Sequence, residues 1–347
     1  MIDPEMPTHT ALNLHNFTVF ADQTFEFVPG LNVLVGENGT GKTHVMKALY
    51  AWQLARHLAD TGRGADYERL FAETYGAKAA GELQRSKTRA ALVTGQFGPS
   101  AWEVGFQQNL TTDNGVRPSA PRPVFIPAIE MMAHARNMNG ILRDYADFDR
   151  TCFDFVSLVT AQPNSLSDAD RNEVNRAIEP LQKLVPGQVH YDDTEQRFYL
   201  TEKKQKLPFS LVAEGFRKIS ALSRLIQYGW LPPGSVLFWD EPEVNLNPKW
   251  MDEVVEALVA LARQNVQIFL ATHNYVILKE IDLVLRAQNR IGPVPVRFFS
   301  LHKEGGASKA TWSDDFSDIT PNAILDQYDQ MLMEDMRLPR SKAESRQ

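Results

Sequence analysis

The chain has 347 residues, of which 43% are hydrophobic, and its 43 acidic residues outnumber its 36 lysines and arginines to give a net charge of −7. This length can bury the core of one large domain or two smaller ones, and the acidic balance argues against a surface coated throughout by nucleic acid. The single cysteine, Cys152, excludes a disulfide framework, and the lack of a secretory leader or of about 18 consecutive apolar residues predicts a cytoplasmic protein that spans no membrane.

The first third of the chain is expected to be rich in strands. Apolar and alternating segments predict short β strands at 12–15, 17–20, 24–27, 31–35, 90–96, 102–106 and 124–127. A helix is predicted over 42–58, where apolar residues recur at helical spacing and neither glycine nor proline occurs. The segment 111–123 is predicted to be a loop because of its Asn, Gly, Pro and Ser content.

The remainder of the chain alternates between helices and strands. Helices are expected across 129–186 and at 211–228, 248–263 and 321–336, and strands at 188–191, 197–201, 235–239, 266–271 and 296–301. This alternation predicts an α/β core with a largely parallel sheet, into which the helical stretch in the middle is inserted. The polar tail from 338 to 347 is expected to be frayed.

A phosphate-binding loop is the first motif with chemical content. Gly36-Glu37-Asn38-Gly39-Thr40-Gly41-Lys42-Thr43 matches the pattern G-x-x-x-x-G-K-[ST] between a predicted strand and a predicted helix. Glycines let backbone N–H groups close around phosphate, and the helix N-terminus adds positive potential. We expect Lys42 to reach the β- and γ-phosphates of ATP and Thr43 to ligate Mg²⁺. A chance Gly-rich turn would lack that strand and helix context.

Two consecutive carboxylates follow the apolar strand predicted at 235–239. Asp240 and Glu241 lie at the carboxyl end of that strand, which in a parallel sheet faces the same edge as the phosphate-binding loop. Asp240 is therefore expected to hold Mg²⁺, directly or through water, and Glu241 to act as general base towards the attacking water. The alternative is a solvated acidic turn before a helix, and Glu243 is the next candidate for the base.

A histidine ends the next predicted strand. His273 would reach the same edge of the sheet, where it could hydrogen-bond the γ-phosphate or the catalytic water. Its alternative role is that of a polar cap at the start of the following helix.

The helix predicted at 211–228 begins with a further candidate site. Ala213, Glu214 and Gly215 lie at its start, where free N–H groups could form a second anion site. The basic pair Arg217 and Lys218 could add charge at the γ-phosphate. The residues alone favour an ordinary helix start with that pair solvated.

Taken together, these motifs resemble the ABC-type ATPase heads of the SMC, RecF and OLD groups. The resemblance rests on GENGTGKT, EGFRK, a strand leading into DEPEVNLNP, and ATHN, and on the opening LNLHNFTVFADQTFEFVPGLNVLV. It implies an α/β fold with an ABC-type, RecA-like P-loop NTPase core, an N-terminal antiparallel β lobe and an inserted helical lobe. Residues 1–128 would form the β lobe and the P-loop part, 129–230 the inserted lobe with the hairpin and the signature-like motif, 231–337 the rest of the core, and 338–347 a flexible tail.

The resemblance also implies roles for individual residues. Asp240 and Glu241 would be the Walker B pair, Asn245 to Asn247 the D-loop, and His273 the switch histidine. Ala213–Gly215 would be the signature motif that covers ATP bound to the opposite subunit. Two heads would then dimerise head to tail around two ATP molecules, or assemble into a higher oligomer.

Three features depart from the family pattern. Ala213 stands where the signature serine is usual, unless Ser210 is shifted into its place. Asn247 stands where the acidic-strand motif usually has a histidine, and no Q-loop glutamine occurs near Pro127 to Glu130. These departures affect the expected ATP site between two heads and the positioning of water. They do not affect the phosphate-binding loop.

The resemblance implies an ATP-hydrolysing head, with ATP and Mg²⁺, that regulates or drives a separate effector such as a nuclease or toxin in anti-phage defence or another DNA-related process. No long coiled coil is expected, and the segment after His302 is too short for the TOPRIM nuclease of OLD proteins, so a free-standing head is expected. The alternatives are the nucleotide-binding subunit of a transporter, a repair ATPase acting directly on DNA, and a phosphotransferase, which would release a phosphorylated product.

Two segments allow more than one interpretation. The lysines of 203–206 could contact DNA phosphate or form a solvated turn. The C-terminal helix presents Ile324, Leu325, Tyr328 and Leu332 on one face. That face could close the core of its own head or dock an effector, because the apolar stripe of a helix must be buried against something.

Overall fold

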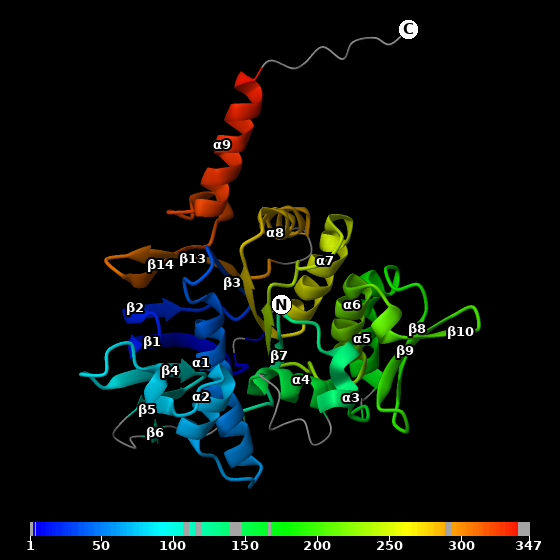
Figure 1. The fold of residues 1–347 in the computed structure, drawn as a ribbon, viewed down its shortest axis with the longest axis horizontal. Coiled ribbons are helices and arrows are strands. Elements are labelled where there is room, and N and C mark those ends of the chain that lie inside the picture. Colours follow the sequence, from blue (N-terminus) through cyan, green and yellow to red (C-terminus); the bar gives the residue numbers. More distant parts are fainter. Residues whose placement is uncertain are drawn as a thin grey trace.

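The computed structural model describes residues 3, 5–106, 111–114, 120–138, 148–165, 168–288 and 293–338. These residues form three sheets with helices packed between and around them (Figure 1). In this part of the chain, none of the helices combines the length and the apolar character needed to cross a bilayer.

The central sheet has six strands within the described residues, in the order β14-β13-β3-β12-β11-β7. Neighbouring strands are parallel except β14, which pairs antiparallel with β13. The strands are β3 (Leu31–Gly36), β7 (Val124–Ile126), β11 (Val236–Asp240), β12 (Gln267–Thr272), β13 (Val296–Glu304) and β14 (Ala307–Ser313). The predicted α/β core with a largely parallel sheet is therefore confirmed, although the sequence pattern predicts no strand at β14.

Both faces of this sheet are covered, which explains why its central strands read as continuous apolar runs. Successive side chains of a strand point to opposite faces. Phe238 and Phe269 accordingly join the core under the β lobe, whereas Leu237 and Ile268 join the core under the helices. All four side chains are fully buried.

The β lobe is a five-stranded antiparallel sheet over the described residues, in the order β2-β1-β4-β5-β6. Its strands are β1 (His9–Phe17), β2 (Phe20–Glu26), β4 (Ala91–Phe97), β5 (Ser100–Phe106) and β6 (Thr111–Asn114). Helices α1 (Lys42–Asp60) and α2 (Tyr67–Tyr75) share its core and appear in blue beside it in Figure 1. The prediction of a loop from residue 111 is wrong for β6, because pairing with β5 supplies the order that its short polar sequence does not indicate. Residues 115–119 of that predicted loop lie outside the described residues.

The inserted lobe is helical, as predicted. It contains α3 (Ala135–Met138), α4 (Arg150–Thr160), α5 (Asp168–Gln182) and α6 (Glu214–Gln227). The predicted hairpin is present as β8 (Gln188–Asp192) and β9 (Arg197–Glu202), and β10 (Gln205–Pro208) adds a third strand. These strands project from the side of the molecule opposite the β lobe (Figure 1). Residues 139–147 and 166–167 of the expected helical stretch lie outside the described residues.

The last part of the chain returns to the central sheet and then leaves it. A short 3₁₀ turn (Pro248–Trp250) leads into α7 (Met251–Arg263), and α8 (Tyr275–Gln288) follows β12. Helix α9 (Ala323–Arg337) stands away from the body (Figure 1), and none of its residues is buried. In the first turn of α9, Ile324 and Leu325 are partly buried against the core. For the rest of the helix, the interpretation that its apolar face closes the core of the head is wrong.

Candidate functional site

The phosphate-binding loop joins a central strand to the first helix. β3 ends at Gly36 and α1 begins at Lys42, as the motif predicts. Gly41 precedes the helix with φ +99°, and a Cβ built on it would lie 2.6 Å from a methyl group of Val19 and 2.7 Å from the ring of Phe20. A Cβ on Gly36 would lie 2.2 Å from the carbonyl oxygen of Leu301. Only glycine fits at these two positions, because the loop lies directly against the β lobe and β13.

Lys42 lies folded back over the loop. Its Nζ donates to the carbonyl oxygens of Gly36 and Glu37 at 2.7 and 3.0 Å, and the residue is 6% exposed. Burial lowers the pKa of Lys42, while the nearby carboxylates of Glu241 and Asp240 oppose that shift. The loop residues 37–39 are exposed beside this buried cation. The loop thus presents accessible backbone with one ammonium group at its centre, as phosphate binding requires.

Thr43 and Asp240 meet although 197 positions separate them in the sequence. The Thr43 hydroxyl donates to Oδ2 of Asp240 at 2.9 Å. Asp240 is 9% exposed, and its burial raises the pKa of this carboxyl to about 6, against the opposing effect of the Thr43 hydrogen bond. The second carboxylate oxygen, Oδ1, is buried without a hydrogen-bond partner among the described residues. A buried oxygen without a partner beside a hydroxyl is a suitable donor set for Mg²⁺.

The described residues offer no all-protein cage for such an ion. Over the residues described, no group of three or more His, Cys, Asp and Glu side chains is placed to hold a metal. Mg²⁺ commonly binds through one or two protein oxygens and completes its shell with water and substrate phosphate. Thr43 and Asp240 would therefore hold the ion together with a nucleotide rather than alone.

Glu241 and His273 lie side by side at the ends of neighbouring parallel strands. β11 pairs in register with β12, so the residues that follow them share one edge of the sheet. Nδ1 of His273 lies 3.0 Å from Oε1 of Glu241, and their side chains are 41% and 25% exposed. Glu241 has a left-handed backbone, with φ +46°, and its N–H donates to Ala271 at 2.9 Å. The base candidate is thus held at its backbone and remains open to water.

Glu243, the second candidate for the base, has a different environment. Oε1 of Glu243 accepts a hydrogen bond from the Thr272 hydroxyl at 2.6 Å, and the residue is 5% exposed. Burial raises the pKa of Glu243, with the Thr272 bond opposing it. These contacts suit a side chain that ties β11 to β12. Glu241, which is more exposed, is the better placed of the two to accept a proton from water.

The signature-like residues lie at the start of α6. Ala213 is exposed there, Glu214 is partly exposed, and Gly215 is buried. A Cβ on Gly215 would lie 2.9 Å from the carbonyl oxygen of Asn245 and 3.0 Å from the ring of Trp250. The glycine is therefore required within its own chain, because the predicted D-loop packs directly on it.

Buried charges lie behind this helix that the sequence pattern does not indicate. Lys218 is 2% exposed, and its Nζ donates to the carbonyl oxygen of Glu241 at 3.5 Å. Burial lowers the pKa of Lys218, while four surrounding glutamates, Glu214 first, oppose the shift. Nε of Arg217 lies 2.9 Å from Oε2 of Glu130, which is 7% exposed. The interpretation of Arg217 and Lys218 as a solvated pair is wrong. Lys218 follows Gly215 by three positions on the buried face, and that spacing was the available signal.

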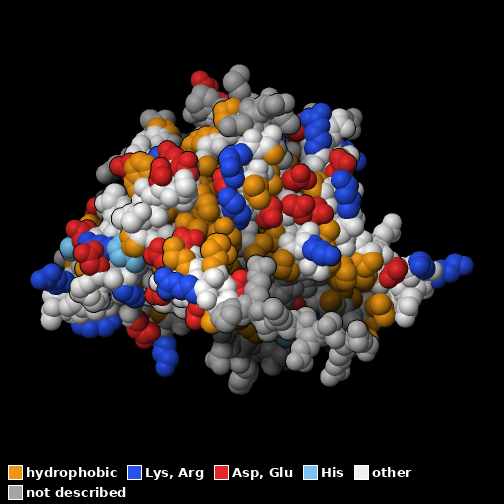
Figure 2. Space-filling view, turned by 90° about the horizontal axis from the view of Figure 1, so that it is seen from above, with side chains coloured by type: hydrophobic (Ala, Val, Ile, Leu, Met, Phe, Trp, Pro, Cys, Tyr) orange, Lys and Arg blue, Asp and Glu red, His pale blue; other side chains and the backbone are white. Residues whose placement is uncertain are grey.

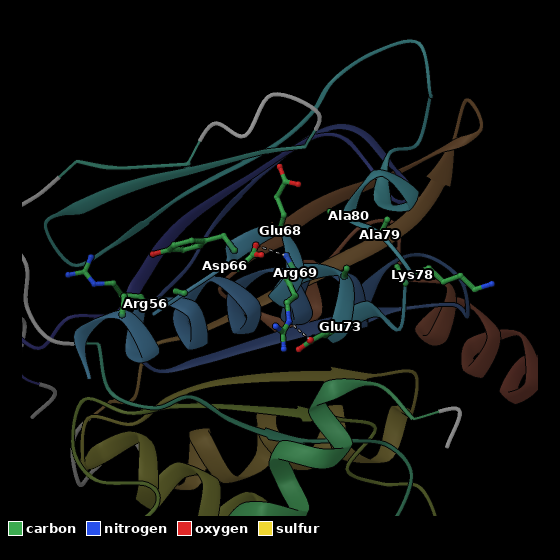
Figure 3. Close-up of a pocket in the computed structure, with 13 residues that line it drawn as sticks. Arg56, Asp66, Glu68, Arg69, Glu73, Lys78, Ala79 and Ala80 are labelled. Atoms are coloured by element: carbon green, nitrogen blue, oxygen red, sulfur yellow. Dashed lines mark hydrogen bonds and ion pairs between the residues drawn. The ribbon is translucent and has the colours of Figure 1, made fainter. Parts of the chain in front are cut away.

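A separate pocket lies away from the phosphate-binding loop. A cavity of about 970 Å³ is lined by the end of α1, by α2 and by the turn after it (Figure 3). Its charged side chains largely satisfy one another: Arg69 pairs with Glu73 at 2.7 Å, and Asp66 caps α2 by accepting from the Arg69 N–H. No residue of the phosphate-binding loop lines it. This pocket is therefore separate from the candidate nucleotide site, where the loop residues 37–39 are exposed.

Comparison with known proteins shows the families to which this chain is related. Residues 60–279 match a protein family described as "AAA domain, putative AbiEii toxin, Type IV TA system", and residues 11–71 match a second AAA-domain family. The "DNA replication and repair protein RecF" of Pediococcus pentosaceus is 36% identical over 81 residues, which is 23% of this chain and 21% of that protein. RecF of Latilactobacillus sakei is 38% identical over 93 residues, or 26% and 24% of the two chains. These alignments therefore span about a quarter or less of each RecF protein.

Solved structures agree in fold. An Smc head domain with an extended coiled coil, bound to the C-terminal domain of ScpA and derived from Pyrococcus furiosus, superposes with a TM-score of 0.56. It is 13% identical and covers 96% of this chain and 100% of that one. A SmcHead bound to the C-winged helix domain of ScpA gives a TM-score of 0.54 at 13% identity, covering 88% and 98%. At this identity the comparison bears on the fold alone.

Proposed function

This chain belongs to the AAA-domain family, as an SMC- and RecF-like P-loop ATPase head of the ABC type, and on that premise we propose that it binds Mg²⁺-ATP and hydrolyses the bond between the β- and γ-phosphates. The observation that supports this function most directly is the convergence at one edge of the sheet. The Thr43 hydroxyl lies 2.9 Å from the Asp240 carboxylate. Glu241, the residue after Asp240, lies 3.0 Å from His273.

Each residue has a separate task in the proposed reaction. Lys42 would move from the loop carbonyls to the β- and γ-phosphates, while Thr43 and Asp240 would hold Mg²⁺, which neutralises phosphate charge when bound. Glu241 would accept a proton from the attacking water as its oxygen bonds to the γ-phosphorus. The bond from that phosphorus to the bridging oxygen breaks, leaving ADP and inorganic phosphate. His273 would orient the Glu241 carboxylate through the contact at 3.0 Å.

We further propose that two heads form a sandwich around ATP. The exposed start of α6, with Ala213 and Glu214, would face the phosphate-binding loop of the other copy, where its N–H groups suit an anion. Ala213 cannot offer a hydroxyl to phosphate, so backbone donors would carry that contact. The exposure of loop residues 37–39 on a single head is consistent with completion of the site by a second head.

The proposed role is to regulate or drive a separate effector protein in a DNA-related or defence process. Two observations support it: the RecF relatives are named for DNA replication and repair, and the family description names a toxin and a toxin–antitoxin system. Direct binding of DNA is a second candidate, favoured by exposed lysines at 203–206 on the projecting hairpin. Lys206 already pairs with Asp192 at 3.2 Å and lies 3.8 Å over the Tyr199 ring, so it is less available for phosphate.

The proposed reaction is tested by measuring phosphate release and ATP affinity on matched variants. Lys42→Ala should lose ATP binding, whereas Glu241→Gln should bind ATP and lose turnover by at least about 100-fold. Glu179→Gln is the control, since that side chain is 70% exposed on the inserted lobe. Unchanged turnover in Glu241→Gln would move the base elsewhere, and a phosphorylated product other than inorganic phosphate would reject hydrolysis.

A further inference from the structure

Helix α9 is anchored at one end and free along the rest of its length. Asn322 caps it by accepting from the Leu325 N–H at 3.2 Å, and the ring of Tyr328 lies 4.5 Å from that of Tyr275. Tyr275 opens α8 only two positions after His273. From there α9 leads away from the body (Figure 1).

The free part of α9 exposes an unusual amount of apolar surface. Beyond the anchoring ring of Tyr328, which is itself 43% exposed, Met331, Leu332, Met333, Met336 and Leu338 are 55% to 75% exposed. Tyr328, Leu332 and Met336 follow one another at four-residue spacing and therefore share a face of the helix. Figure 2 shows the molecule from above, with hydrophobic side chains exposed among both acidic and basic ones. Contiguous apolar surface of this kind marks a place where another surface binds.

The same helix is acidic, which restricts what can cover it. The helix has one basic residue, Arg337, and four acidic ones, Asp326, Asp329, Glu334 and Asp335. Its net charge is therefore −3. Among the described residues, none of these four carboxylates takes part in an ion pair. Pairing α9 with its counterpart in a second copy would bring two helices of charge −3 together. A surface with basic residues around an apolar floor would instead neutralise them.

We propose that α9 is the docking helix for a partner protein whose apolar groove is rimmed by lysine and arginine. Leu332 and Met336 would fill the groove, and the acidic side chains would pair with its rim, which is the usual arrangement of an amphipathic helix in a groove. The methionines suit this task because they adapt to irregular pockets. This inference deepens the effector part of the proposed function, but it does not require ATP hydrolysis.

The test begins in native host cells with the full chain carrying a photo-crosslinking residue at position 333, and at exposed position 179 as control. The crosslinked protein is identified by mass spectrometry and purified, and its affinity for the head is measured by calorimetry. Leu332→Glu should weaken binding at least tenfold. The pair Asp329→Asn and Asp335→Asn should weaken binding about fivefold and reduce its dependence on salt. Because these side chains are exposed, all variants should keep the wild-type circular dichroism spectrum and melting temperature.

A complementary exchange gives the decisive result. Asp329→Lys should lose binding, and a lysine- or arginine-to-glutamate change on the groove rim of the partner should restore it. A crosslink no stronger at 333 than at 179, a crosslink only to a second copy, or an affinity unchanged by both sets of variants would each overturn the proposal. ATP hydrolysis is measured on the same preparations. A head that docks its partner without turnover defeats only the proposed reaction, and a head with turnover that does not dock defeats only this inference.

Discussion

Nδ1 of His273 lies 3.0 Å from Oε1 of Glu241, across the ends of two neighbouring parallel strands. A histidine in this position can hold the carboxylate in one orientation towards water. His273→Ala should therefore lower kcat by about 10- to 100-fold while leaving KM for ATP within about twofold. Steady-state kinetics would check this, with His15→Ala as control because His15 is 51% exposed on the β lobe. A large rise in KM alone would assign His273 to ATP binding instead.

Asp240 should make the nucleotide-free head less stable at neutral pH. Its pKa rises from 3.8 to about 6 on folding because of burial, so the folded state holds the proton more tightly than the unfolded chain does. Ionisation of Asp240 therefore costs the folded state about 3 kcal/mol above pH 6, and this cost disappears as the pH falls below 4.

Asp240→Asn removes that cost and should raise the free energy of unfolding by about 3 kcal/mol at pH 7.5, but by only about 1 kcal/mol at pH 4.5. Urea unfolding at the two pH values measures the difference. Asp22→Asn, at a side chain that is 78% exposed, is the control. An equal increase in the free energy of unfolding at both pH values would show that the effect of Asp240 on stability does not come from its ionisation. ATP turnover should fall in the same variant, because the proposed Mg²⁺ ligand loses its charge.

Lys218 should act on turnover through the backbone of Glu241. Lys218→Met removes the buried ammonium group that donates to the Glu241 carbonyl and leaves the nearby carboxylates without their cation. We expect kcat to fall about tenfold with ATP affinity nearly unchanged, and Lys218→Arg to recover part of the loss. Lys183→Met, at a side chain that is 66% exposed, should have neither effect. Equal losses of stability and turnover in both Lys218 variants would indicate a purely structural residue.

Gly215 is a test of the contact between α6 and the D-loop. In Gly215→Ala, the new methyl group would lie 2.9 Å from the Asn245 carbonyl oxygen, which must shift. We expect a loss of about 1 to 3 kcal/mol in stability and lower turnover, with ATP binding by each chain retained. Gly81→Ala is the matched control, because nothing lies within 4 Å of a Cβ built there. A wild-type melting temperature for Gly215→Ala would show that the predicted D-loop shifts away from the new methyl group without loss of stability.

Much of the fold follows from local sequence signals. The strands β3, β11 and β12 and the helices α1 and α7 lie where apolar runs and helical spacing predict them. β6, β10 and β14 were not predicted, because these strands at the edges of their sheets owe their order to a neighbour's backbone and leave little periodicity in the sequence.

The sequence by itself identified the candidate site residues: the predicted phosphate-binding loop, the pair Asp240 and Glu241, and His273. Each belongs to a strand and the turn that follows it, so that a few consecutive residues specify both its conformation and its chemistry. The tertiary structure alone decided which distant groups meet: Thr43 with Asp240, Arg217 with Glu130, and Lys218 with the backbone of Glu241. It also decided that α9 leaves the core. An apolar stripe records that a helix needs a covering surface, but only the packing of the whole chain shows whether its own head supplies one.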